Sequence, residues 1–99
     1  MITTRLKNRA KQSFCRFRIS AAAFDRKGIL LGTSVNKPRF IKFGGGIHAE
    51  MSLIHQYKKR IKHITLCRIG KNGNFLPIEP CDSCRKVINI LGISYDSVL

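Results

Sequence analysis

The chain has 99 residues, 43% of them hydrophobic, and carries 19 Lys and Arg against 5 Asp and Glu, for a formal net charge of +14. This length suits one domain and excludes two separate cores, so we expect residues 1–99 to form a single domain. The apolar content and the lack of low-complexity tracts exclude a disordered tail, and no apolar run is long enough to span a membrane or to form a signal peptide. We therefore expect a soluble cytoplasmic protein with no membrane partner.

The first predicted element is a helix, because apolar residues recur every fourth position from Ile2 to Phe14. Thr3 or Thr4 is available as its N-terminal cap. Residues 17–23 then alternate between apolar and polar side chains, which predicts a strand with one face buried.

After a turn at residues 25–28, the apolar segment 29–35 predicts a second strand. So short a connection favours an antiparallel hairpin. A helix is expected to begin close to His48, because apolar residues continue from there to Tyr57 at helical spacing. The apolar run within residues 61–69 suits a central strand.

The last helix is expected to begin after Pro80 and to stop at Gly92, with a final strand at residues 93–99. Its predicted inward positions are Cys84, Val87, Ile88 and Leu91. The crossover through this helix is expected to be right-handed, which makes the strand at 61–69 and the last strand parallel. The order of elements therefore predicts an α/β layered domain with a mixed sheet of four or five strands.

Two short motifs carry the chemistry of this sequence. His48 and Glu50 stand at the start of one predicted helix, and Cys81 and Cys84 stand three apart at the start of the next. One histidine and two cysteines suit a single Zn²⁺ and leave its fourth position open for a water molecule, which is typical of a catalytic site. A carboxylate at Glu50 suits proton transfer beside that water.

Other interpretations of the same residues are a redox-active cysteine pair or a structural zinc site. A structural site needs a fourth ligand, and the candidates His55, His63, Cys15 and Cys67 do not stand at motif spacing. A structural site would also have no use for Glu50. Cys15 and Cys67 are expected to be small apolar core residues, and His55 and His63 to be partly exposed.

The combination His-x-Glu followed by Pro-Cys-x-x-Cys resembles the signature of the zinc-dependent cytidine deaminase superfamily. The sequence Ile78-Glu79-Pro80-Cys81 resembles the same region of deoxycytidylate and tRNA adenosine deaminases. The resemblance implies a three-layer α/β/α fold and hydrolytic loss of ammonia from C4 of cytosine or C6 of adenine. It implies that His48, Cys81 and Cys84 bind one catalytic zinc ion with its water or hydroxide, and that Glu50 moves protons.

The same resemblance implies that Asn36 contacts a ribose hydroxyl and that the Ala49 backbone helps to hold the base. Asn36 also has a simpler interpretation as a turn residue at the end of a strand. An aromatic wall for the base could come from Phe17, Phe24, Phe40, Phe43 or Tyr57, although aromatic residues at such spacing are more often part of the core.

The charge bears on the substrate, because a strongly basic protein attracts polyanions. Basic residues gather at Lys58-Lys59-Arg60 and Lys62. This slightly favours cytosine in single-stranded nucleic acid over a free cytosine nucleotide, cytidine or deoxycytidylate. A free-nucleotide enzyme of this size is expected to need a homo-oligomer to complete its pocket. Adenosine deamination in RNA, or a non-catalytic nucleic-acid-binding module stabilised by zinc, are the remaining hypotheses.

Overall fold

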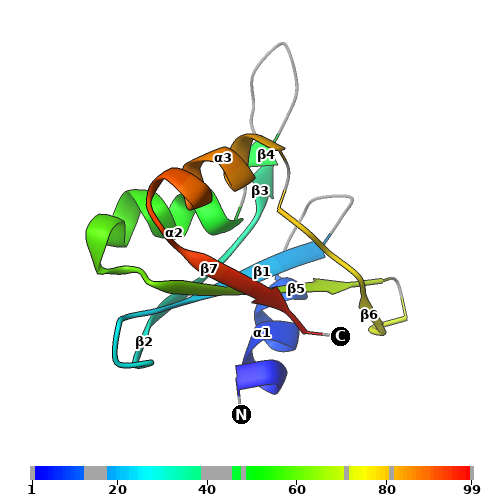
Figure 1. Ribbon diagram of the computed structural model, residues 1–99. Helices are drawn as coiled ribbons and strands as arrows, with labels where there is room; N and C mark the ends of the chain where they lie inside the picture. The colour runs from blue at the N-terminus through cyan, green and yellow to red at the C-terminus, as the bar shows by residue number, and fades with distance from the viewer. Residues whose placement is uncertain are drawn as a thin grey trace.

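The computed structural model describes residues 2–12, 18–38, 46–47, 49–70, 72–80 and 82–98. A sheet lies between helices, with α2 and α3 over one face and α1 over the other (Figure 1). In chain order the elements are α1 (Ile2–Ala10), β1 (Arg18–Phe24), β2 (Leu30–Val35), β3 (Lys37–Pro38), β4 (Gly46–Ile47), α2 (Ala49–Tyr57), η1 (Lys58–Arg60), β5 (His63–Ile69), β6 (Phe75–Leu76), α3 (Asp82–Ile90) and β7 (Ser94–Ser97).

The sheet is mixed and contains five strands, which confirms the predicted fold class. Strand β5 is central: it pairs antiparallel with β1 along one edge, and along the other edge with β7 in parallel and then with β6 in antiparallel orientation. The predicted parallel arrangement of the last strand and the strand at 61–69 is therefore correct. Strand β6 stops before Pro77, which has no amide hydrogen to continue a ladder.

Strands β1 and β2 form the predicted antiparallel hairpin. The Asp25 carboxylate closes the turn, because its Oδ1 accepts hydrogen bonds from the amides of Lys27 and Ile29, each at 2.9 Å. Gly28 has a φ of 81°, a left-handed conformation that glycine adopts without strain.

Strand β1 is buried on both faces, so the prediction that only one of its faces is buried was wrong. Ala21 and Ala23 pack under α2 and α3, while Ala22 on the other face packs under α1. The reason is that β1 lies inside the sheet, between β2 and β5, and helices cover it from both sides. Small side chains in β1 allow both helical layers to approach closely.

Helix α1 starts at Ile2, so Thr3 and Thr4 lie inside it and the predicted cap at either residue was wrong. Packing of Leu6 and Ala10 against the sheet stabilises the helix, which therefore includes the first apolar residue of the stripe, Ile2. The buried Ser20 hydroxyl in β1 donates a hydrogen bond of 2.7 Å to the Leu6 carbonyl oxygen and holds the helix against the strand. Phe14, the last residue of the predicted stripe, lies outside the described residues.

Helix α3 stops where the sequence predicts. Gly92 has a φ of 68°, and the Ile93 amide donates to the Ile88 carbonyl oxygen at 3.0 Å, which closes the helix end. Leu91 was predicted to face inward but is 37% exposed. It follows the last helical residue, Ile90, and so no longer shares the apolar helix face.

Candidate active site

The first turns of α2 and α3 lie at the same end of the molecule. Both helices have nine residues. Tyr57, the last residue of α2, and Leu91, the residue after α3, line the same pocket, so the two helices also end close together. The two helices lie side by side over the sheet and run in the same direction (Figure 1). Glu50 at the start of α2 and Cys84 at the start of α3 therefore occupy the same end.

Glu50 is a buried carboxylic acid, with only 4% of its surface exposed. It lies in the first turn of α2 beside the fully buried Ala49. Burial of a carboxylate is unfavourable unless it interacts with polar or positive groups, although the N-terminal end of a helix dipole favours a negative charge. A chain with so few acidic residues places one of them inside, which is the position expected of a group with a chemical role.

Cys84 is 1% exposed and lies in the first turn of α3. Helix N-termini favour the thiolate form in which cysteine binds metals. His48 and Cys81 lie outside the described residues. Within the described ranges no three His, Cys, Asp or Glu side chains gather as a metal site, so zinc ligation by His48, Cys81 and Cys84 stays a prediction. The donor set of one imidazole and two thiolates fits zinc.

A small ladder, which the sequence did not predict, brings the end of β2 to the start of α2. Strands β3 and β4 pair antiparallel, with Lys37 opposite Ile47. Lys37 directly follows Asn36, and Ile47 directly precedes position 48. The ladder therefore brings Asn36 close in the fold to the start of α2 at Ala49, although 13 positions separate the two residues in the sequence.

The Asn36 side chain has an observed structural role. Its Oδ1 accepts a hydrogen bond from the Ile19 backbone N–H at 3.1 Å, and the backbone N–H of Asn36 donates to the Ile19 carbonyl oxygen at 3.0 Å. Asn36 thus extends the pairing of β2 with β1 by one residue and fixes its side-chain carbonyl. Asn36 follows the last residue of β2, as predicted, but it continues the pairing with β1 and is not in a turn, and its ribose contact stays a prediction.

Ser34 is a site residue that sequence reasoning missed. Its hydroxyl, buried on the face of β2 that α2 covers, donates a hydrogen bond of 2.5 Å to the carbonyl oxygen of Ala49. This contact anchors the first residue of α2, next to Glu50, to the sheet. The one available signal in the sequence is a polar residue at the end of the apolar strand 29–35.

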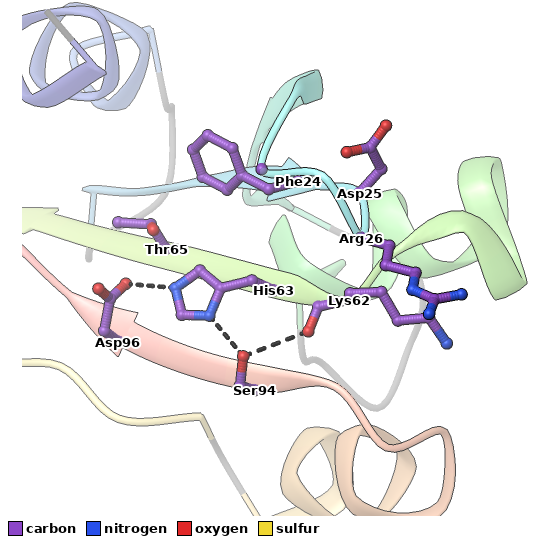
Figure 2. Close-up of a pocket in the computed structure, with 9 residues that line it drawn as sticks. Phe24, Asp25, Arg26, Lys62, His63, Thr65, Ser94 and Asp96 are labelled. Carbon is purple, nitrogen blue, oxygen red and sulfur yellow. Dashed lines mark hydrogen bonds and ion pairs between the residues drawn. The ribbon is translucent and has the colours of Figure 1, made fainter.

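Figure 2 shows a second polar cluster, which lies on the face of the sheet that α1 covers, because His63 contacts Phe24 of that core. The His63 ring lies between two residues of β7: its Nε2 donates to Asp96 Oδ1 at 3.0 Å, and its Nδ1 lies 2.6 Å from Ser94 Oγ. Phe24, which contacts the core under α1, lines the same cavity of about 490 Å³. The cluster joins β5 to β7 and does not belong to the site at the starts of α2 and α3.

The other predicted candidates fall into three groups. Cys67 is fully buried and His55 is exposed, as expected, while Cys15 lies outside the described residues. Phe24 packs against the core under α1 and Tyr57 lies at the opposite end of α2 from Glu50, so neither forms a wall for a base at Glu50. The remaining aromatic candidates, Phe17, Phe40 and Phe43, lie outside the described residues. No helix in the described part of the chain is long and apolar enough to cross a membrane.

Comparison with known proteins agrees with this architecture. The model of the cytidine and deoxycytidylate deaminase zinc-binding region matches residues 2–98. Among curated proteins, no sequence gives a significant match.

Several solved structures share the fold. The cytidine deaminase from Burkholderia pseudomallei is 19% identical with a TM-score of 0.67, over 91% of this chain and 73% of that one. The cytidine deaminase from Mycobacterium leprae is 21% identical with a TM-score of 0.64, over 91% and 76%. The enzyme from Mycobacterium tuberculosis is 23% identical with a TM-score of 0.62, over 91% and 74%.

Proposed function

Because the chain belongs to the cytidine and deoxycytidylate deaminase family, whose cofactor is zinc, we propose that this zinc-dependent hydrolytic deaminase acts on the cytosine of a free nucleoside. The observation that carries the proposal is the buried carboxylate of Glu50, at the end of the molecule where Cys84 lies in the first turn of α3. Cytidine is the proposed substrate, and the products are uridine and ammonia.

We assign zinc binding to His48, Cys81 and Cys84, since imidazole and thiolate ligands suit this metal. When bound, zinc supplies a Lewis acid that makes a water molecule reactive at neutral pH. Cys84 is held rigidly for this task because its side chain is buried in the first turn of α3. The same helix end favours its thiolate.

Glu50 moves the protons of the reaction. Its carboxylate accepts a proton from the attacking water as the water oxygen bonds to C4 of cytosine, and it donates that proton to ring nitrogen N3. Glu50 then transfers the proton of the new C4 hydroxyl to the amino group, so that the bond between C4 and the amino nitrogen breaks, ammonia leaves and a carbonyl remains at C4. Burial of Glu50 keeps bulk water from competing for these protons.

Asn36 and Ala49 are proposed to position the nucleoside. Hydrogen bonding to Ile19 fixes the Asn36 side chain, which we propose contacts a ribose hydroxyl. The Ser34 hydroxyl fixes the Ala49 carbonyl, and we propose that the backbone at Ala49 contacts the base. The pairing of Lys37 with Ile47 supports both roles because it brings the two segments together.

The choice of a free nucleoside departs from the slight preference for single-stranded nucleic acid that the charge suggested. The three solved structures described above are cytidine deaminases by name, which favours a nucleoside. The net charge of +14 keeps polynucleotide cytosine as a second candidate substrate.

A substrate panel tests the proposal. The zinc-loaded protein is incubated with cytidine, deoxycytidylate, and single-stranded DNA and RNA that contain cytosine and adenine, and uracil or inosine is measured by mass spectrometry. We expect uridine from cytidine, and no product from a sample stripped of metal by a chelator. Product from oligonucleotides alone would overturn the nucleoside assignment.

A further inference from the structure

A basic groove with an apolar floor lies where α2 and α3 end. The cavity measures about 580 Å³, and its floor is formed by Ile54, Tyr57 and Leu91. The three exposed cations of η1, Lys58, Lys59 and Arg60, form its rim. None of the described residues that line it is acidic. Ile90, the residue before Leu91, is 83% exposed.

We propose that this groove binds single-stranded nucleic acid, with unpaired bases on the apolar floor and phosphates on the cations of η1. The chemistry of the groove matches this ligand, because such strands bind through aromatic and guanidinium stacking combined with positive charge along the backbone. The proposal concerns binding and does not depend on the deaminase activity.

Tyr57 and Arg60 form the stacking element. The Arg60 guanidinium carbon lies 5.9 Å from the centre of the Tyr57 ring. The hydroxyl end of that ring lies against Gly32 in β2, where an added Cβ would come within 2.3 Å of the Tyr57 oxygen. The ring is therefore held at one end by the sheet, and an ordered aromatic ring beside a guanidinium plane suits a flat base.

The backbone at the rim is also unusual. Lys58 has a φ of 49°, the one left-handed residue other than glycine among those described. This conformation is unfavourable for lysine, and such strain is retained where the surrounding structure or a function requires it. It ends α2 and directs the chain into η1, so that three consecutive cations stand at one rim.

Charge disfavours a second copy of the chain as the occupant of this groove, because three exposed cations line it and each chain carries +14. An acidic peptide would satisfy the cations but would make little use of the aromatic and guanidinium pair. The aromatic and cationic part of the groove is also separate from Glu50: Tyr57 lies seven residues further along α2, roughly 10 Å along the helix axis. A nucleoside bound at Glu50 leaves the groove accessible.

The first experiment measures binding of fluorescein-labelled oligothymidylate of 15 nucleotides by fluorescence anisotropy. This probe has no cytosine, so binding is separated from turnover. The groove variant is Lys58→Gln, Lys59→Gln and Arg60→Gln combined, and the charge-matched control is Arg5→Gln, Lys11→Gln and Lys27→Gln, three exposed residues elsewhere. We expect at least tenfold weaker binding for the groove variant and less than threefold for the control, with cytidine deamination unchanged in both.

The salt dependence of oligothymidylate binding gives a second test of phosphate contacts. Each phosphate contact on a single strand contributes about 0.7 to the slope of log K against log salt, so the groove variant should lose about 2 from that slope. An equal loss of affinity in the groove and control variants would overturn the proposal, because the protein would then respond only to net charge.

The second experiment tests stacking. Tyr57→Leu keeps an apolar side chain in the groove and should weaken oligothymidylate binding about tenfold at unchanged salt slope. Circular dichroism confirms that this variant is folded, and the triple variant tests the same groove without altering the core. A duplex of equal length should bind more weakly than the single strand. Equal affinity for the duplex, undiminished binding by Tyr57→Leu, or equally effective competition by polyglutamate would each refute a single-strand groove.

Discussion

The hydroxyl of Ser34 in β2 donates a hydrogen bond to the carbonyl oxygen of Ala49, the first residue of α2, at 2.5 Å. The bond is buried and joins the sheet to the helix one residue before Glu50. The position of the proposed proton-transfer group therefore depends on a contact between two residues that no local sequence motif connects.

Loss of this bond should affect both stability and turnover. Ser34→Ala is expected to lower the free energy of unfolding by about 1 kcal/mol, as for other buried hydrogen bonds. It should also lower kcat for cytidine several-fold, because the start of α2 is then less firmly held. Urea denaturation and steady-state kinetics measure the two effects, with Ser97→Ala on an exposed strand as control. Lower stability with unchanged kcat would restrict Ser34 to a structural role.

Close contact between Gly32 and Tyr57 predicts that substitutions of these two residues have non-additive effects on the free energy of unfolding. A Cβ at position 32 would lie 2.3 Å from the Tyr57 oxygen and 3.0 Å from its ring carbon Cζ. Gly32→Ala should therefore lower the free energy of unfolding by about 1–3 kcal/mol through overpacking. The loss should be smaller in a Tyr57→Phe background, where the hydroxyl is absent. Additive effects in this double-mutant cycle would refute the contact.

The left-handed backbone of Lys58 predicts a stabilising substitution. Lys58→Gly should raise the free energy of unfolding by roughly 0.5–1 kcal/mol, because glycine adopts this φ without strain and the gain exceeds its larger entropy in the unfolded chain. Lys59→Gly, next to it but without positive φ, should be destabilising. Thermal denaturation compares the two variants, and a loss of stability in both would contradict the expected strain at Lys58.

The buried thiol of Cys67 is expected to make the folded protein less stable at alkaline pH. Burial raises the pKa of its thiol above the ordinary value of 9.0, and a side-chain hydrogen bond with Ser20 and the charge of Lys7 oppose that rise. A pKa raised by folding contributes stability below the pKa of the unfolded chain, and this contribution is lost as pH rises through the pKa of the folded state. The free energy of unfolding should therefore fall more steeply from pH 8 to pH 10 in the wild type than in Cys67→Ala. Parallel pH profiles would contradict this interpretation.

Much of the fold was predictable because its signals are local. The stripe from Ile2 to Ala10, the turn at Asp25 and the helix stop at Gly92 each depend on a few neighbouring residues. Burial of β1 on both faces was not predictable, because alanine fits an exposed or a buried position equally and the second helical layer is a tertiary feature.

The candidate site also has parts that the sequence predicts and parts that it does not. Motif spacing identified Glu50 and Cys84, which the structure buries at the starts of their helices. Their supporting contacts were missed, since Ser34 and Asn36 act through partners 15 and 17 positions away. The ladder of β3 with β4 contains two residues in each strand, too few for any periodicity to indicate them.

Turnover of cytidine by Glu50→Gln tests the central claim most directly. Glutamine keeps the size of the buried side chain but cannot exchange protons, and Asp96→Asn, an exposed residue on the opposite face of the sheet, makes the same chemical change as a control. We expect both variants to fold and to contain as much zinc as the wild type by elemental analysis. Glu50→Gln should form uridine at least about 100-fold more slowly, the lower range for loss of a general acid–base group, while Asp96→Asn should match the wild type. Uridine formation by Glu50→Gln at the wild-type rate would contradict the account.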